Sequence, residues 1–161
     1  RRIDFTRPAG NTTQYTAGDA ISDNATTATL ATFRLDGLST VVGKGGLIKS
    51  VALYKNDPDL TNASFQFTFF DTQPVGTGFE DNAQLAITDA EWKRMLNFVQ
   101  VITGVDSSGM ITGDAFGKSN CDIPYAYVTG ASPIYVVMSA VGAYTPADGE
   151  AFTIIVGGIQ Y

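Results

Sequence analysis

Hydrophobic and polar residues alternate along most of this 161-residue chain. The clearest run is Ser64–Phe70. In it, Phe65, Phe67 and Phe69 share one face, and the polar residues between them share the other. A period of two is the side-chain period of a β-strand, whose successive residues point to opposite faces of a sheet. We therefore expect these three phenylalanines to line the core of a sheet protein.

Six further segments have the composition of strands. They are Arg1–Arg7, Thr29–Leu35, Leu47–Tyr54, Leu96–Ile102, Ile134–Val141 and a last strand from Phe152 to about Ile159. Leu96–Ile102 and Ile134–Val141 are apolar on both faces, which is typical of strands that lie between two layers or under a partner. Thr145–Gly149 predicts a turn before the last strand. Gly157 and Gly158 predict a bulge or a close backbone approach within it.

One short helix is expected near Asp89–Met95. Thr88 is followed by Glu91 three residues later, which is the pattern of a capping box. We expect Trp92 to pack this helix over an edge of the sandwich. Two stretches are predicted to be long loops, namely Ala9–Thr27 and Thr72–Gln84.

These elements predict one domain over residues 1–161. The pattern contains no repeat and no composition change that marks a boundary. About eight strands with a single helical insertion predict an all-β, jelly-roll-like two-sheet β-sandwich. An immunoglobulin sandwich is disfavoured, because the cysteine and tryptophan framework of that fold is missing.

The residue types that most enzymes need are scarce. The chain has no histidine, which removes the commonest general base and most catalytic zinc sites. Its one cysteine, Cys121, has no histidine to activate it and is expected to be a small apolar filler. The neighbouring carboxylates fall in turns or at a helix start, where such residues are usually structural. These pairs are Glu80 with Asp81, Asp89 with Glu91, and Asp148 with Glu150.

No cofactor or metal is expected either. The acidic turn Asp57–Asp59 lacks the ligand spacing of a known calcium loop. The glycine-rich stretch Gly43–Gly46 precedes a strand, so it offers no helix N-terminus to a phosphate. We therefore expect a protein that is not an enzyme, with no catalytic, cofactor-binding or metal site.

The charge balance limits the classes of molecule that could be binding partners. The formal net charge is −6, and only 16% of the residues are charged. A nucleic-acid binder needs clustered Lys and Arg, so nucleic acid is not expected as a partner. No apolar run approaches the length of a membrane span, so no membrane partner is expected. Few charges make a broad surface inexpensive to desolvate, which favours protein partners.

Both ends of the chain carry motifs of a known family. Phe5–Ile21 has the sequence FTRPAGNTTQYTAGDAI, and Gly142–Phe152 has the sequence GAYTPADGEAF. Ile123–Val128 and Ile134–Val137 lie between them in the same order. This arrangement resembles tailed-phage virion proteins that begin FTRPADTTAYAAGDAV and end gAYTPaSgEtFt, and that look like jelly-roll head decoration (cement) proteins. The segment Phe79–Met95 aligns least.

The resemblance implies a bacteriophage structural protein on the outer surface of the capsid. Its partners would be the major capsid protein and further copies of itself, as a dimer or trimer. The alternative is a carbohydrate-binding or receptor-binding β-sandwich module of a tail or fibre. A carboxylate-dependent hydrolase ranks last, because no site for it is evident.

We expect the termini and long loops to make the contacts. Arg1, Arg2 and Arg7 concentrate positive charge at one end of an acidic chain, which would suit an acidic neighbour. The polar loop Ala9–Thr27 is expected to order on a partner. Its deletion is expected to leave the sandwich folded.

Overall fold

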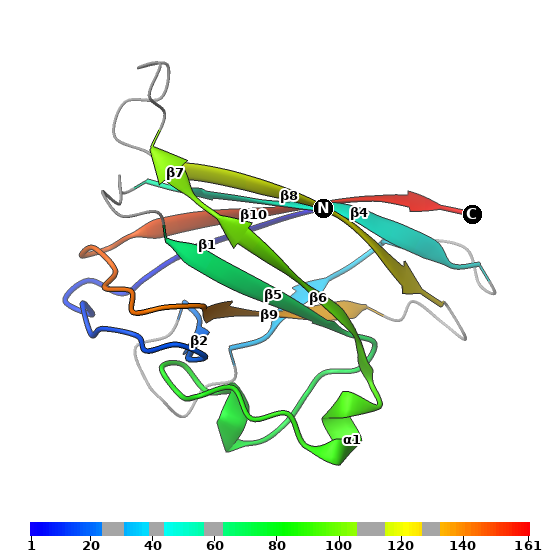
Figure 1. Ribbon diagram of the computed structural model, residues 1–161, viewed down its shortest axis with the longest axis horizontal. Coiled ribbons are helices and arrows are strands. Elements are labelled where there is room, and N and C mark those ends of the chain that lie inside the picture. The colour runs from blue at the N-terminus through cyan, green and yellow to red at the C-terminus, as the bar shows by residue number, and fades with distance from the viewer. Residues whose placement is uncertain (24–30, 39–43, 57–62, 106–114, 127–132) are drawn as a thin grey trace.

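The computed structural model describes residues 1–23, 31–38, 44–56, 63–105, 115–126 and 133–161. Two antiparallel sheets pack face to face within this part of the chain (Figure 1). We name them the β4 sheet and the β5 sheet after two of their central strands. The β4 sheet has the order β1 (Arg2–Thr6), β10 (Ala151–Gln160), β4 (Gly46–Lys55), β8 (Ala115–Tyr125) and β7 (Gly104–Val105). The β5 sheet has the order β2 (Ala20–Ile21), β9 (Ile134–Ala140), β5 (Ser64–Phe70) and β6 (Met95–Ile102), and β3 (Phe33–Leu35) also pairs with β9.

The strand pairing follows a nested order along the chain. β1 pairs with β10, β3 with β9, β4 with β8, and β5 with β6, all antiparallel. The chain is therefore a long hairpin whose two arms wind together across both sheets. This topology is that of a jelly roll. The predicted all-β sandwich with one short helix is confirmed.

The core lies between the two sheets. Phe65, Phe67 and Phe69 are fully buried on the inner face of β5, as the alternation predicts. They meet the apolar inward positions of the β4 sheet, including Leu53 and Phe152. The ring of Phe65 lies edge-on to that of Phe152, with centroids 6.3 Å apart. This burial is the main source of stability that the fold offers.

A second hydrophobic cluster covers part of the outer face of the β5 sheet. Phe70 and Val137 point away from the main core and are fully buried. Phe79, at the end of the short 3-10 helix η1 (Thr77–Phe79), packs over them with its ring edge-on to that of Phe70. The prediction that Ile134–Val141 is covered on both faces is confirmed by the burial of β9.

For Leu96–Ile102, the alternative of burial between two layers of the chain is wrong, and burial under a partner stays a prediction. In β6, Val99 and Val101 are buried, whereas Phe98 is 49% exposed and Ile102 is 62% exposed. The segment that carries Phe79, Leu85 and Ile87 packs over β9 and the end of β5. It leaves the outer face of β6 uncovered. The apolar residues on the second face of β6 are therefore surface residues.

Two backbone predictions for the last strand are confirmed. Gly149 ends the turn before β10 with a φ of 65°, a left-handed conformation that glycine adopts without strain. The register between β10 and β4 shifts between Gly157 and Gly158, which marks the predicted bulge.

The helix α1 (Asp89–Trp92) is shorter than predicted. The Thr88 side chain accepts a hydrogen bond from the Glu91 backbone N–H at 3.4 Å, which confirms the N-terminal cap. The helix ends at Trp92 because β6 begins at Met95. Glu91 is the buried side chain of this turn, and Trp92 is 63% exposed. The prediction that Trp92 packs against the sandwich is wrong.

The exposure of Trp92 gives a direct optical prediction. It is the single tryptophan of the chain, so intrinsic fluorescence reports on it alone. We expect the native emission maximum to be that of an indole in water. Trp92→Ala should change the free energy of unfolding by no more than about 0.5 kcal/mol, because surface substitutions away from caps and networks cost little. A blue-shifted native emission or a larger loss would contradict this placement.

The predicted long loop Ala9–Thr27 is packed against the sandwich over its described residues, 9–23. Tyr15 is fully buried, and Ala20 and Ile21 form β2 against β9. The backbones of Tyr15 and Tyr144 also form an isolated bridge. The expectation that Ala9–Thr27 orders only on a partner is therefore wrong for residues 9–23, and its deletion would remove part of the sandwich. Residues 24–27 lie outside the described residues.

Candidate functional site: the outer face of the β4 sheet

The outer face of the β4 sheet is a broad surface made by the outward positions of its four longer strands. The inward positions of β10, namely Phe152, Ile154 and Val156, are buried in the core. The residues between them point the other way and are partly or largely exposed. Strand register places the outward residues in rows: Asp4, Thr153, Tyr54 and Phe116 form one, and Arg2, Ile155, Ala52 and Lys118 form the next.

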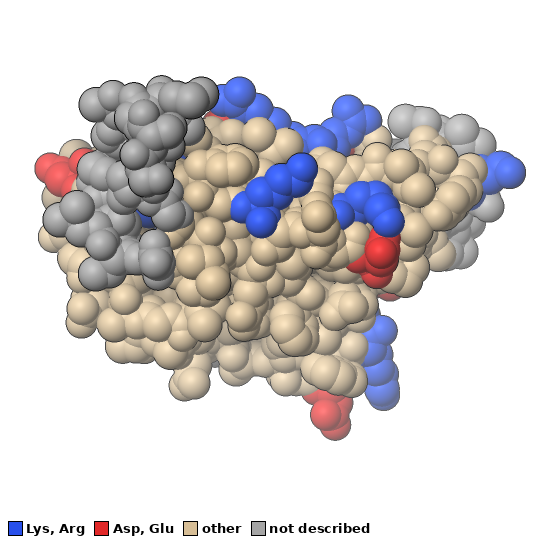
Figure 2. Space-filling model, turned by 45° about the horizontal axis from the view of Figure 1, so that its top comes forward, with Lys and Arg blue, Asp and Glu red and all other residues tan. Residues whose placement is uncertain are grey.

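This face combines exposed apolar groups with few charges. Ile155 and Phe116 are each 44% exposed, although both lie in regular strands. Thr153 and Asn120 add uncharged polar groups. Figure 2 brings the top of the molecule forward, and most of the surface in that view is neither acidic nor basic. Such a surface can be buried by a protein partner with little cost in ion desolvation.

The charges that are present leave the face slightly basic. Arg2 is paired with Asp4 through Nε at 2.7 Å, and Lys49 is paired with Asp122. Lys118 is exposed on β8 and makes no ion pair with any described residue. These three cations and two anions sum to one positive charge, in a chain whose net charge is −6. An acidic partner surface would complement this face.

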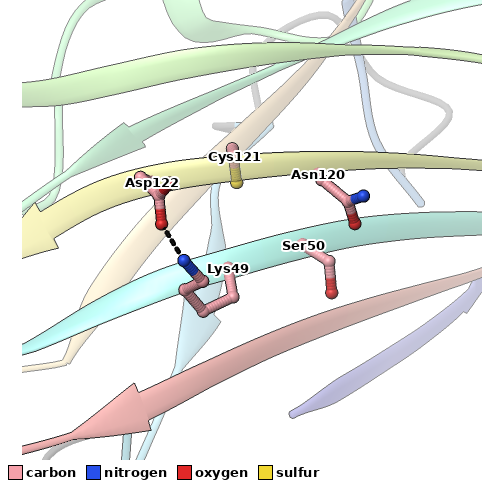
Figure 3. A pocket seen from close by; sticks show the side chains of 5 residues that line it. All are labelled: Lys49, Ser50, Asn120, Cys121 and Asp122. Carbon is pink, nitrogen blue, oxygen red and sulfur yellow. Dashed lines mark hydrogen bonds and ion pairs between the residues drawn. The ribbon is translucent and has the colours of Figure 1, made fainter.

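A shallow hollow of about 410 Å³ lies between β4 and β8 (Figure 3). Lys49 and Ser50 line it from β4, and Asn120, Cys121 and Asp122 line it from β8. The β4–β8 register shifts between Ile48 and Ser50, so the regular alternation is interrupted here. The hollow gives the face relief into which a partner's side chain can fit.

Cys121 is an inert part of this hollow. Its side chain is half-buried, it packs against the main core, and its thiol lies 3.5 Å from the Ile48 carbonyl oxygen. Burial raises the pKa of the thiol above its ordinary value, which disfavours the reactive thiolate. These contacts agree with the predicted role as a small filler.

A buried ion pair holds the N-terminal segment to the loop after η1. Arg7 Nη1 lies 2.8 Å from Asp81 Oδ1, and both side chains are at least 97% buried. The same carboxylate accepts hydrogen bonds from the Tyr15 hydroxyl at 2.9 Å and the Ser22 backbone N–H at 2.8 Å. Burial raises the pKa of Tyr15, so its hydroxyl stays protonated as a donor. The prediction that Arg7 offers its charge to a neighbour is wrong, because Asp81 binds it inside the fold.

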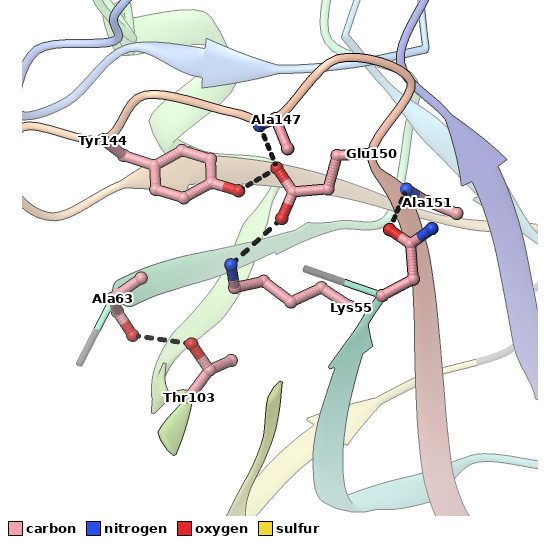
Figure 4. Close-up of polar contacts among 8 residues, drawn as sticks. Lys55, Ala63, Thr103, Tyr144, Ala147, Glu150 and Ala151 are labelled. Atoms are coloured by element: carbon pink, nitrogen blue, oxygen red, sulfur yellow. Dashed lines mark hydrogen bonds and ion pairs between the residues drawn. The ribbon is translucent and has the colours of Figure 1, made fainter. Parts of the chain in front are cut away.

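A second buried ion pair fixes the turn before β10 (Figure 4). Lys55, at the end of β4, lies with its Nζ 3.0 Å from Glu150 Oε1, and both side chains are inaccessible to water. The Tyr144 hydroxyl donates to Glu150 Oε2, and the Ala147 backbone N–H donates to the same oxygen at 3.2 Å. Burial raises the pKa of Glu150, although these donors and Lys55 oppose the shift. The carboxylate is therefore occupied by structural contacts.

The Glu150 pKa gives a prediction about pH. A carboxyl group whose pKa is raised in the folded state binds protons more tightly there, so its contribution to stability declines as pH rises from its ordinary pKa of 4.5. The free energy of unfolding of the native protein should therefore decrease relative to that of Glu150→Gln as pH rises above 4.5. Urea unfolding of both proteins at several pH values measures this, and a difference that moves the opposite way would contradict it.

The other predicted carboxylates do not come together in a common site. Asp148 accepts a hydrogen bond from the Gly10 backbone N–H at 2.6 Å, and Asp89 lies in the first turn of α1. Within the described ranges, no three His, Cys, Asp or Glu side chains come together in a way that could hold a metal ion. The turn Asp57–Asp59 lies outside those ranges. No helix among the described residues is long and apolar enough to cross a membrane.

Comparisons with known proteins add no further identification. No family model matches the chain, and no curated protein matches it in sequence. The candidate surface is therefore described by its geometry: it is an exposed, weakly basic sheet face with exposed apolar groups on β10 and β8 and a hollow between β4 and β8.

Proposed function

We propose that this chain is a capsid decoration (cement) protein of a tailed phage. It binds the major capsid protein on the outer surface of the virion and stabilises that lattice. The observation that carries the proposal is the exposed outer face of the β4 sheet. Stable protein interfaces bury roughly 800 Å² per partner, and a whole sheet face with few ions suits that requirement.

The fold supports the family resemblance on which the proposal also depends. The two motif segments are 121 or more residues apart in sequence, since one ends at Ile21 and the other begins at Gly142. They nevertheless form one packed unit: the backbone N–H of Arg7 donates to the Glu150 carbonyl oxygen at 2.8 Å. Phe5 also stacks on Phe152, with ring centroids 4.9 Å apart. The shared motif residues are thus those that close the ends of this sandwich.

The proposal includes self-association as a dimer or trimer. The N-terminal segment bonds to β10 only as far as Val156, whose backbone pairs with Arg1, so the last residues of β10 extend past this pairing. Ile159 and Tyr161 are exposed there, 47% and 65% respectively. They offer apolar area to a second copy next to the lattice contact. The proposal assigns no catalytic activity, because the buried carboxylates Asp81 and Glu150 are each held by several donors.

A charge reversal on the proposed contact face tests this function. We expect Lys118→Glu to weaken binding to undecorated capsids at least tenfold in a cosedimentation assay, because it would oppose an acidic partner surface. Lys93→Glu is the matched control, since Lys93 is the exposed C-terminal cap of α1, and α1 lies on the side of the β5 sheet away from the β4 sheet (Figure 1). Failure of the native protein to sediment with capsids, or equal binding by both variants, would contradict the proposal.

A further inference from the structure

A second hollow, which we call the groove, lies on the opposite side of the molecule, over the outer face of the β5 sheet. It has a volume of about 300 Å³. Its lining residues are Gly18, Gln66, Leu85, Ile87, Gln100, Ser139, Ala140 and Val141. None of them is charged. The volume falls at the small end of the range for small-molecule sites.

The wall of this groove is held in place by backbone hydrogen bonds. The Leu85 N–H donates to the Gly18 carbonyl oxygen at 2.8 Å, and the Gly18 N–H donates to the Ala140 carbonyl oxygen at 2.7 Å. Asp19 and Gln84 form an isolated bridge beside them. The groove is therefore formed before any ligand arrives, which lowers the entropic cost of binding.

Two glutamine amides form the polar part of the floor. Gln100 Nε2 lies 3.5 Å from Gln66 Oε1, and Gln66 Nε2 donates to Thr68 Oγ1 at 3.3 Å. A primary amide has two donors and an oxygen with two lone pairs, so these bonds orient both amides without using all their capacity. Ser139, on the neighbouring strand β9, adds a hydroxyl to the lining.

The apolar part of the groove lies next to these amides. Leu85 and Ile87 supply aliphatic surface. The site thus offers paired donors and acceptors beside a wall suited to C–H groups, which are the two surfaces that a sugar ring presents.

The position of the groove argues against a peptide in the extended form. Its floor includes β5, which is paired with β9 on one side and with β6 on the other. The backbone groups of β5 are therefore already used, and strand addition needs a free edge. Charged ligands have no counter-charge among the lining residues.

We propose that this groove binds a neutral glycan, through one or two sugar units. Gln66 and Gln100 bind sugar hydroxyls, while Leu85 and Ile87 contact the C–H face of the ring. The groove lies over the β5 sheet and the proposed capsid contact is on the β4 sheet. These two sheets form opposite layers of the sandwich (Figure 1). A chain attached through its β4 sheet would therefore display the groove away from the capsid, where it can meet glycans on a cell surface.

A glycan array of neutral hexose and N-acetylhexosamine oligosaccharides, probed with the labelled full chain, tests this proposal. The best neutral glycan is then titrated by calorimetry against the native protein, against Gln66→Ala/Gln100→Ala, and against the control Gln14→Ala, an exposed glutamine that does not line the groove. We expect the double variant to lose at least tenfold in affinity and the control to bind as the native protein does. Both glutamines are at least partly exposed, so the variant should fold, and its thermal midpoint verifies this.

Three results would overturn the proposal: no neutral glycan is retained, only anionic glycans are retained, or the double variant binds with native affinity. These outcomes are separate from the capsid assay. Failure of the native protein to bind any neutral glycan, with intact cosedimentation, would reject the groove alone, and glycan binding without cosedimentation would reject the capsid contact alone.

Discussion

Asp81→Ala should destabilise the protein by about 3–5 kcal/mol, the typical loss when one partner of a buried ion pair is removed. The substitution leaves the Arg7 guanidinium buried without its carboxylate, at a site where its side chain is 99% buried. It also removes the acceptor of the Tyr15 hydroxyl and of the Ser22 N–H. Domains of this kind have total stabilities of about 5–15 kcal/mol, so the variant should be close to unfolding under mild conditions.

Urea unfolding followed by circular dichroism measures this loss. Asp36→Ala is the matched control, because Asp36 forms an ion pair of the same length with Arg34 on the exposed surface. The control should change the midpoint little, since exposed pairs contribute little. A loss below about 1 kcal/mol for Asp81→Ala would mean that the Arg7 site is not a buried structural centre.

Phe67→Ala should cost about 3–5 kcal/mol through lost burial and the cavity left behind. Phe67 is fully buried at the centre of β5, between β9 and β6, where neighbouring side chains cannot easily collapse into the space. Phe98→Ala applies the same truncation to a half-exposed phenylalanine of the adjacent strand. We expect the control to lose less than half as much, and equal losses would contradict the assignment of the two faces.

Alternation alone predicted the strands whose inward residues are large. β5 is the clearest example, because Phe65 and Phe67 contrast strongly with their polar neighbours. β8 was not predicted, because its inward positions include the small residues Gly117 and Ser119 and its sequence contains Pro124. A small residue is required at Gly117, where a Cβ would come 2.2 Å from the Ile102 carbonyl oxygen. Because β8 packs closely against β6, it needs small residues at inward positions, and its sequence therefore lacks the hydrophobic alternation that predicts a strand.

The buried ion pairs were not predicted, although the pattern contained a signal. Arg7 continues the inward positions of Ile3 and Phe5, and Lys55 continues those of Val51 and Leu53. A charged residue at a strand position that points into the core implies a buried residue of opposite charge. Its identity could not be inferred, because Asp81 is 74 residues from Arg7 and Glu150 is 95 residues from Lys55.

The candidate surface and the groove depend on strand register, which the sequence does not specify. Ile155 lies beside Ala52, and Ala52 beside Lys118, only because β10 and β8 flank β4 in this alignment. The side of the helical turn that is buried was equally undetermined, because four residues are too few to define an amphipathic face. Trp92, expected to be packed, is therefore exposed, and Glu91 is the buried side chain of the turn.

Cryo-electron microscopy of the phage particle that carries this chain tests the central claim most directly. The proposal predicts density for the sandwich on the outside of the capsid, with the outer face of the β4 sheet against the major capsid protein. Ile155 and Lys118 should lie within that contact, and the groove lined by Gln66 and Gln100 should face outward. Absence of the chain from the capsid, or attachment through the β5 sheet, would contradict the account.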